Sequence, residues 1–575
     1  MTSLPAERRA QKDLGAFYSP PALVEPMIEW AVTGPLASVL DPSSGDGVFI
    51  EAAARRLLRL GATPAAAARQ VHAFDLNPEA ARVTREALRS ALGPLEPDVR
   101  AASFFSLEPP GTLFGEATVD TIVGNPPYIR YQAFSGASRE QALGRALESG
   151  VKLTQLASSW AHFVVHAVAF LKRGGRLALI LPAEFIHASY SVALRRHLRE
   201  SFKVLDVISF RSAVFPGAQE EVILLLASGK GEPHQRLGLV ELDSAFDLRA
   251  LDEVLLRAEA FDAGVEPAKW VPGYAANPSA ACLERLRDAG SLMTLGQVGK
   301  ASIGFVSGAN EFFVLSPEEA ATLRLPESSL RPALIRARQV PGLSITRKLI
   351  SGMHEENERY LLWCPGAELT ASERAYIRHG EATGIATRYK CRVRSPWWIV
   401  PGVVVPDAFL TYMSDVVPRL CLNEAAAVAA NTLLTVRLPR VPKRLRKVFV
   451  TAFYNSATLL SCERTGRSYG GGVLKLEPSE ADRILVPSTR LLRENQAALS
   501  ALSKQLREGL AAGGDLMERA IRAVDAVVLA AAGVGTDEVE QLARARGDLA
   551  SRRRSRARAG RVHRSEMAAE GPSSP

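Results

Sequence analysis

The 575-residue sequence lacks several features that define special classes of protein. No apolar stretch follows the opening residues 1–9, which argues against a signal peptide, and no uninterrupted apolar run approaches about 18 residues, the length of a membrane span. The five cysteines are scattered and none forms a Cys-x-x-Cys pair. The cysteine pattern argues against a zinc site or another metal site, and it favours a reducing cytoplasm as the protein's location. The lack of a long apolar run leads us to expect no membrane partner.

The chain also has little excess of charge outside one short segment. Its formal net charge is +9, and residues 551–564 hold seven arginines and no acid, so removing these seven charges leaves +2. A nucleic-acid surface on the body of the protein must therefore be a local patch. The apolar content of 47% indicates a globular protein, and the length predicts two or three domains.

The motif Asn-Pro-Pro-Tyr follows a predicted apolar strand at residues 121–123. The side-chain oxygen of Asn125 and the carbonyl of Pro126 can both accept hydrogen bonds from one amino group, and the prolines stiffen the turn. The ring of Tyr128 offers a planar base a surface for stacking. An ordinary Asn-Pro turn is the alternative. We predict that the whole motif is catalytic: Asn125, Pro126, Pro127 and Tyr128.

Two strand ends upstream carry acids. The strand 38–41 ends at Asp41 and leads through Pro-Ser-Ser-Gly-Asp-Gly into a helix near Phe49. This is the pattern of the first β–α unit of a Rossmann-like sheet, in which glycines let the backbone approach a ligand. The next strand ends at Asp75, where a carboxylate can accept both ribose hydroxyls of an adenosine cofactor. Alternatively, Asp75 or Asn77 caps the following helix.

These motifs, with Gly-Ala-Phe-Tyr-Ser-Pro at residues 15–20, resemble the amino-group S-adenosylmethionine (SAM) methyltransferases. The sequence is most similar to the gamma-order N6-adenine DNA methyltransferases, in which a target-recognition domain comes last. The resemblance implies SAM as the cofactor. It places the following residues around SAM: Tyr18, Ser19, Asp41, Pro42, Ser43, Gly45, Gly47, Asp75, Ser103 and Phe104. Ser103 departs from the family pattern, which usually has an acid at this position. The resemblance also implies that Phe215 stacks on the flipped-out adenine opposite Tyr128.

Two basic stretches lie in the glycine-punctuated, β-rich second half of the chain, at residues 388–394 and 437–447. Cations on phosphates set the register of a protein on DNA, whereas solvated loops are the alternative. We expect DNA contacts from six of these cations: Arg388, Lys390, Arg392, Arg394, Lys443 and Arg444.

The fold class predicted is α/β, with a Rossmann-like doubly wound SAM-dependent methyltransferase domain, an α/β target-recognition domain and a C-terminal helical segment. The expected boundaries are 1–230 for the catalytic domain, 231–290 for a connector, 291–490 for target recognition, 491–550 for C-terminal helices and 551–575 for a disordered arginine-rich tail.

The predicted reaction transfers a methyl group from SAM to N6 of a flipped-out adenine in double-stranded DNA. Methylation of cytosine N4, of an RNA base or of a protein glutamine stays open, as does an inactive DNA-binding subunit. Eleven residues before Lys12 leave no room for a nuclease domain. We therefore expect a separate restriction endonuclease or defence-system partner.

Overall fold

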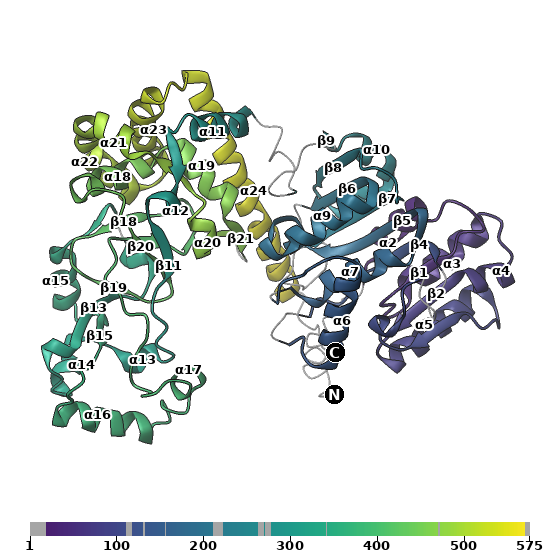
Figure 1. The fold of residues 1–575 in the computed structure, drawn as a ribbon, viewed down its shortest axis with the longest axis horizontal. Coiled ribbons are helices and arrows are strands. Elements are labelled where there is room, and N and C mark those ends of the chain that lie inside the picture. Colours follow the sequence, from purple (N-terminus) through teal and green to yellow (C-terminus); the bar gives the residue numbers. More distant parts are fainter. Residues whose placement is uncertain are drawn as a thin grey trace. The chain divides into compact units, whose positions relative to one another are not determined.

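The computed structural model describes residues 19–110, 118–129, 133–155, 157–210, 222–262, 270, 278–340, 342–469 and 472–569. The chain divides into two compact units (Figure 1). Unit 1 comprises residues 1–276 and 559–575, and unit 2 comprises residues 277–558. Within the described ranges, no helix has the length and apolar character that crossing a membrane requires.

Unit 1 contains a nine-stranded sheet with the order β3-β2-β1-β4-β5-β7-β6-β8-β9. The strands are β1 (Val39–Asp41), β2 (Val71–Asp75), β3 (Asp98–Ala101), β4 (Val119–Gly124), β5 (Leu171–Pro182), β6 (Phe202–Phe210), β7 (Val222–Lys230), β8 (Arg236–Leu242) and β9 (Glu259–Asp262). The first five strands pair in parallel, and β7 runs antiparallel between β5 and β6. Strands β2 and β3 are added on one side of β1, whereas β4 and β5 lie on its other side. The strand order therefore reverses between β1 and β4, and open α/β sheets bind ligands at such a point.

Helices cover both faces of this sheet (Figure 1). They are α2 (Pro21–Ala31), α3 (Val48–Arg59), α4 (Pro64–Gln70), α5 (Pro78–Leu92), α6 (Ala137–Glu148), α7 (Ser159–Ala169), α8 (Glu184–His187), α9 (Val192–Ser201) and α10 (Leu251–Leu256). Helix α3 contacts α2 and α5, whereas α7 contacts α6 and α9. The α/β fold class and the doubly wound arrangement predicted from the sequence are thus confirmed.

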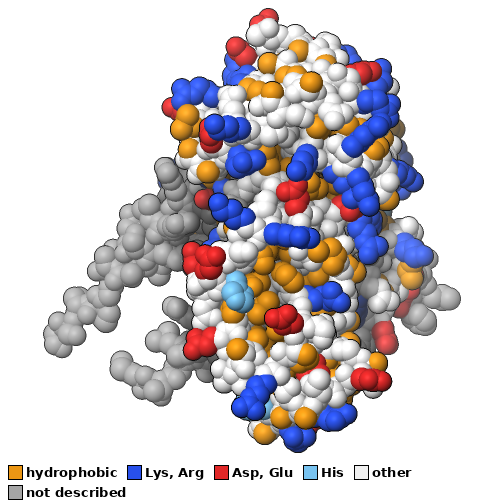
Figure 2. Space-filling model, turned by 90° about the vertical axis from the view of Figure 1, so that its left-hand side faces the viewer, with side chains coloured by type: hydrophobic (Ala, Val, Ile, Leu, Met, Phe, Trp, Pro, Cys, Tyr) orange, Lys and Arg blue, Asp and Glu red, His pale blue; other side chains and the backbone are white. Residues whose placement is uncertain are grey.

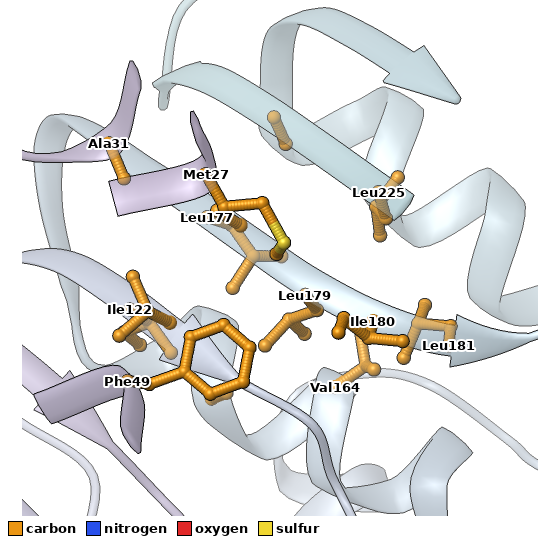
Figure 3. Close-up of a cluster of buried hydrophobic side chains, with 14 of the residues drawn as sticks. Met27, Ala31, Phe49, Ile122, Val164, Leu177, Leu179, Ile180, Leu181 and Leu225 are labelled. Carbon is orange, nitrogen blue, oxygen red and sulfur yellow. The ribbon is translucent and has the colours of Figure 1, made fainter. Parts of the chain in front are cut away.

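Strand β5 lies at the centre of the unit 1 core (Figure 3). Successive side chains of a strand point to opposite faces of the sheet, so β5 can contribute to two apolar layers. Leu177 packs with Met27 of α2, and Ile180 packs with Val164 of α7. All four side chains are fully buried, and the burial of each stabilises the fold by about 1.5–3 kcal/mol. The core therefore fixes the strand ends that carry the polar motifs.

The expected connector at residues 231–290 is wrong in its first part. Strand β8 pairs in parallel with β6 along its whole length, from Arg236 opposite Val204 to Leu242 opposite Phe210, and β9 pairs antiparallel with β8. The many charges of this region suggested a linker, but Leu237 and Leu239 face the core and are buried. The catalytic sheet therefore continues past residue 230 to residue 262.

The described residues of unit 2 form four small sheets. The five-stranded sheet has the order β11 (Lys300–Ile303), β20 (Leu433–Arg437), β16 (Ala408–Thr411), β18 (Leu420–Asn423) and β14 (Ser344–Ile345). The four-stranded sheet has the order β12 (Val314–Leu315), β15 (Leu361–Trp363), β13 (Leu330–Leu334) and β19 (Val428–Ala429). The others are β17 (Met413–Ser414), β22 (Val473–Lys475) and β21 (Arg467–Tyr469), and the pair β10 (Leu292–Thr294) with β23 (Leu485–Pro487).

Helices flank these sheets, and the longest ones follow residue 490. They are α11 (Pro278–Asp288), α12 (Leu295–Val298), α13 (Asn310–Phe313), α14 (Pro317–Thr322), α15 (Arg347–Glu355), α16 (Ala371–Ala382), α17 (Tyr389–Arg392), α18 (Arg446–Phe453), α19 (Ser456–Thr465), α20 (Pro478–Ala481), α21 (Thr489–Glu494), α22 (Gln496–Ala512), α23 (Gly514–Ala531) and α24 (Thr536–Ala569). Helices α22 and α23 pack together and against α18, so residues 491–558 are part of unit 2. A further boundary at 490/491 stays a prediction.

The prediction of a disordered tail from residue 551 is wrong for residues 551–569, which belong to α24. One arginine of this segment makes specific contacts. Arg553 is 4% exposed and forms an ion pair with Glu463 of α19, whose side chain is 5% exposed. The arginine-rich composition predicted repulsion and solvation, whereas a buried carboxylate and two carbonyls hold this arginine in place.

Candidate active site

A hollow of about 780 Å³ lies at the carboxyl ends of β1, β2 and β4. The motifs predicted from the sequence contribute most of its polar wall, because parallel strands deliver their ends to the same edge. The polar wall includes Ser19, Ser43, Asp46, Asp75, Asn77, Ser103 and Asn125. The apolar wall includes Phe49, Leu76, Val83, Phe104, Phe105, Phe134 and Phe163. A cavity with this mixture of apolar surface and polar groups suits a small organic ligand.

The glycine-rich loop after β1 needs its glycines. Gly45 and Gly47 have φ of +55° and +82°, in the left-handed region that side chains disfavour. A Cβ on Gly47 would also lie 3.0 Å from the Cα of Thr84, a residue of α5. The loop is fixed by a hydrogen bond between the hydroxyls of Ser44 and Thr84, at 3.0 Å, and by one from the Ser44 amide to the Phe74 carbonyl, at 2.8 Å. Its backbone can therefore approach a ligand closely.

Asp75 joins the tip of β2 to this loop. Its Oδ2 accepts a hydrogen bond from the Gly45 amide at 2.9 Å, and its Oδ1 accepts one from the Asn77 amide at 2.8 Å. Asn77 is the residue that caps α5, since its side-chain oxygen accepts from the Glu79 amide at 3.0 Å. Both oxygens of Asp75 keep further lone pairs in the hollow. Leu76, beside them, is 69% exposed and offers an apolar face to a ligand.

Ser103 and Phe104 form the far wall, after β3. Phe104 is 2% exposed, and its ring lies 5.8 Å from that of Phe163, nearly parallel, and 4.7 Å from that of His166. The Nε2 atom of buried His166 lies 3.2 Å from the Phe104 carbonyl oxygen. Phe104 is therefore a fixed part of the wall and exposes little of its ring.

The Asn-Pro-Pro-Tyr segment is held against the hollow from two sides. The Ser43 hydroxyl donates to the backbone carbonyl of Asn125, and the side-chain NH2 group of Asn125 donates to the Ser19 hydroxyl, both at 3.4 Å. On the other side, the hydroxyl of Ser159, the first residue of α7, donates to the Pro127 carbonyl and accepts from the Ile129 amide. These bonds orient the segment rigidly.

The members of the motif differ in exposure. Asn125 and Pro127 line the hollow, whereas Pro126 and Tyr128 are buried and do not. Tyr128 is 7% exposed, and its hydroxyl donates to the Ile180 carbonyl at 3.2 Å. The stacking role of Tyr128 stays a prediction. Tyr18 and Phe215 lie outside the described residues, so their predicted roles also stay predictions.

Asp41 supports the segment from beneath. Gly124, the last residue of β4, has φ of +146°, and a Cβ there would lie 2.7 Å from Oδ1 of Asp41. That Oδ1 accepts from the Ser43 amide at 3.1 Å, while Oδ2 is buried without a hydrogen-bond partner among the described residues. Burial is the main cause that raises the pKa of the Asp41 carboxyl to about 8, with smaller contributions from the nearby Asp75 and Asp46, against the lowering effect of the hydrogen bond from the Ser43 amide.

We expect Asp41→Asn to gain stability over the wild type as pH rises. A carboxyl whose pKa is raised by folding stabilises the folded state fully below its unfolded pKa, and loses this contribution as pH rises through the folded value. Between pH 5 and 9 the ligand-free wild type should lose up to about 4 kcal/mol relative to the variant, whose amide does not titrate. Denaturant unfolding at both pH values checks this, and a difference that does not change with pH would contradict it.

The six cations predicted to contact DNA fall into two groups, and all lie in unit 2. Two have protein partners, since Arg388 forms an ion pair with Glu311 and Arg394 donates to the Val306 carbonyl at 2.5 Å. The other four side chains are exposed and make no hydrogen bond or ion pair with the described residues: Lys390, Arg392, Lys443 and Arg444. The basic sequence runs therefore do not distinguish the cations that face solvent from those that bind other groups of the protein.

Sequence motifs did not predict Ser159 or the apolar wall apart from Phe104. Ser158-Ser159 precedes the apolar helix α7, a pattern that usually signals only a helix start. Leu76 and Val83 lie on and after the Asp75 turn, and only the fold turns them toward the hollow. No group of three or more His, Cys, Asp or Glu side chains in the described ranges is arranged to hold a metal ion.

Comparison with known proteins finds matches in both units. Residues 69–215 match the model of the Eco57I restriction-modification methylase, and residues 267–529 match that of the C-terminal domain of type II methyltransferase M.Eco57I. Type II methyltransferase M.XamI from Xanthomonas campestris pv. amaranthicola is 26% identical over 495 residues, which are 82% of this chain and 85% of that protein. Type II methyltransferase M.AccI from Acinetobacter calcoaceticus is 21% identical over 387 residues, which are 65% of this chain and 70% of that protein.

Solved structures show the same fold. The type IIL restriction-modification enzyme MmeI, determined in complex with DNA, superposes with a TM-score of 0.58 at 11% identity, covering 90% of this chain and 73% of MmeI. The type ISP enzyme LlaBIII, bound to DNA, has a TM-score of 0.51 at 13% identity, covering 87% of this chain and 40% of that one. One of the two family matches lies in unit 1 and the other mainly in unit 2, so this chain is similar to the Eco57I restriction-modification methylases in both units.

Proposed function

We propose that the protein transfers the methyl group of SAM to N6 of adenine at a specific sequence in double-stranded DNA. One observation carries this proposal: Asn125 lines the same hollow as Asp75 and the glycine-rich loop, and the Ser43 hydroxyl of that loop bonds the Asn125 carbonyl. A group that accepts hydrogen bonds from an amine therefore lies at the cofactor cavity. In this arrangement the amine of a target base can approach the donor of the methyl group directly.

The residues of the hollow fit SAM. The exposed lone pairs of Asp75 suit ribose hydroxyls, Leu76 and the wall at Phe104 suit the adenine ring, and the close backbone of Gly45 and Gly47 suits the methionine end. Bound SAM supplies a methyl group on a positively charged sulfur. Ser103 supplies a hydroxyl where the resemblance leads one to expect a carboxylate.

The chain's own contribution is orientation and hydrogen bonding. Asn125 accepts a hydrogen bond from the target amino group, which raises electron density on its nitrogen as the bond to carbon forms. The predicted second acceptor, the carbonyl of Pro126, belongs to a residue that does not line the hollow and stays a prediction. Ser159 and Ser19 keep the motif in place, so little reorganisation is needed during the reaction. The base must leave the DNA stack to reach this depth, at a cost of a few kcal/mol.

Duplex DNA is the proposed partner because the match to the M.Eco57I C-terminal domain covers most of unit 2, where exposed cations occur. Cytosine N4 is a less suitable target, since the motif begins with Asn125, not Ser. RNA and protein glutamine methylation would leave unit 2 without a role. The restriction-modification relatives favour a cognate endonuclease on a separate chain.

The substrate class can be tested by incubating the protein and tritiated SAM with duplex DNA, RNA and protein extract in parallel. Label should enter DNA alone. Label in RNA or protein, with none in DNA, would overturn the proposal.

Asp75→Ala should weaken SAM binding by about 1.5–3 kcal/mol, the scale of hydrogen bonds to a charged group. Isothermal titration with SAM measures this loss. Glu86→Ala is the matched control, because it removes an exposed carboxylate from neighbouring α5. Unchanged affinity in Asp75→Ala would contradict the ribose assignment.

A further inference from the structure

A short projecting segment of unit 2, residues 388–394, is held rigidly at both ends. It contains the four-residue helix α17. Arg388 before the helix pairs with Glu311, and Arg394 after it donates to the Val306 carbonyl. Between them Cys391 is fully buried, and its sulfur faces the Ser307 carbonyl at 3.9 Å.

The backbone beneath this segment approaches it closely. A Cβ on Gly308, whose φ is +83°, would lie 2.7 Å from the Cβ of Lys390, so glycine is needed there. The segment is thus anchored along residues 306–311 by an ion pair, a hydrogen bond and a buried side chain. It therefore needs little ordering when a partner binds, which favours tight contact.

The outer side of the same segment is apolar and cationic at once. Tyr389 and Val393 are each 63% exposed. The Lys390 ammonium lies 5.5 Å from the centre of the Tyr389 ring, and the Arg392 guanidinium carbon lies 5.6 Å from it. The surrounding sequence, residues 382–406, contains no acid. An exposed aromatic ring flanked by cations fits a partner that offers flat apolar surfaces and regularly placed negative charge.

We propose that this segment enters a groove of the target DNA, with Tyr389 against the bases and Lys390 and Arg392 on the adjacent phosphates. The proposal rests on the proposed function, and it names a base-contacting element within it. DNA is favoured over an acidic peptide because the cations flank the ring, as phosphates flank bases. Aromatic rings recognise bases by stacking, and apolar wedges separate base steps in bent duplexes.

The test uses the full-length protein and a duplex carrying the sequence that the wild type methylates, with 2-aminopurine placed in turn at each position. Tyr389→Ala should weaken binding to this duplex about 10- to 100-fold and abolish the fluorescence rise at one step. Tyr389→Phe keeps the ring and should bind like the wild type. Lys390→Ala and Arg392→Ala should each reduce the slope of log affinity against log salt by about 0.9.

Lys348→Ala is the matched control, because it removes an exposed cation on α15 of the same unit. A Tyr389→Ala protein that binds the target and shows the same fluorescence pattern as the wild type would overturn this inference alone. A slope of log affinity against log salt that changes in Lys348→Ala, but not in Lys390→Ala or Arg392→Ala, would also overturn this inference. A wild type that neither binds nor methylates duplex DNA would overturn the inference together with the proposed function.

Discussion

Asn125→Ala is expected to lower the methylation rate about 10²–10³-fold, the loss that follows removal of one preorganised hydrogen-bonding group from an active site. The bonds from the target amine to Asn125 strengthen as the nitrogen becomes positively charged, so the loss should appear in kcat. SAM affinity should change little, because Asn125 contacts the cofactor loop through its backbone carbonyl, which alanine retains. Single-turnover methylation and SAM titration measure the two quantities separately.

The control for this variant is Gln141→Ala, which removes an exposed amide from α6 of the same unit. It should methylate at the wild-type rate. Near-normal turnover by Asn125→Ala would refute the assignment of the active site. An equal loss of SAM binding and rate would assign Asn125 to cofactor binding in place of catalysis.

Arg553→Ala is expected to destabilise unit 2 by about 3–5 kcal/mol, because it leaves the carboxylate of Glu463 buried and unpaired. The Arg553 side chain donates to Glu463 at 2.9 and 3.2 Å and to the carbonyls of Asp415 and Gly472. It therefore ties α24 to α19 and to segments beside β17 and β22. We expect the melting temperature to fall by about 10 °C, measured by calorimetry.

Arg554→Ala is the matched control, since its side chain is exposed and, among the described residues, donates only to the Ala550 carbonyl one turn earlier. It should melt like the wild type. The double variant Arg553→Met with Glu463→Leu removes both charges and should recover much of the lost stability. If Arg553→Ala melts at the same temperature as Arg554→Ala, the ion pair between Arg553 and Glu463 does not stabilise the fold.

Local signals explain which parts of the fold and the candidate site the sequence predicts. Strand ends, glycine turns and helix caps are encoded within a few residues, so the positions of β1, β2 and β4 follow from the pattern, as does the cap at Asn77. Parallel strands then bring Asp75 and Asn125 to one edge, although they are 50 residues apart in sequence.

Long-range partners explain what the sequence does not predict. Strand β8 has an ordinary composition, and its pairing with β6 depends on the edge that β6 leaves open. Arg553 reads as one of seven solvated arginines until Glu463, 90 residues earlier, is placed beside it. Arg388 and Arg394 likewise belong to a basic run, and only the fold supplies Glu311 and the Val306 carbonyl as their partners.

The measurement that tests the central claim most directly is nucleoside mass spectrometry of duplex DNA methylated by the wild type and by Asn125→Ala. The wild type should produce N6-methyladenine within one short sequence, and the variant should produce about 10²–10³-fold less in the same time. N4-methylcytosine, or N6-methyladenine at the wild-type rate from the variant, would contradict the account.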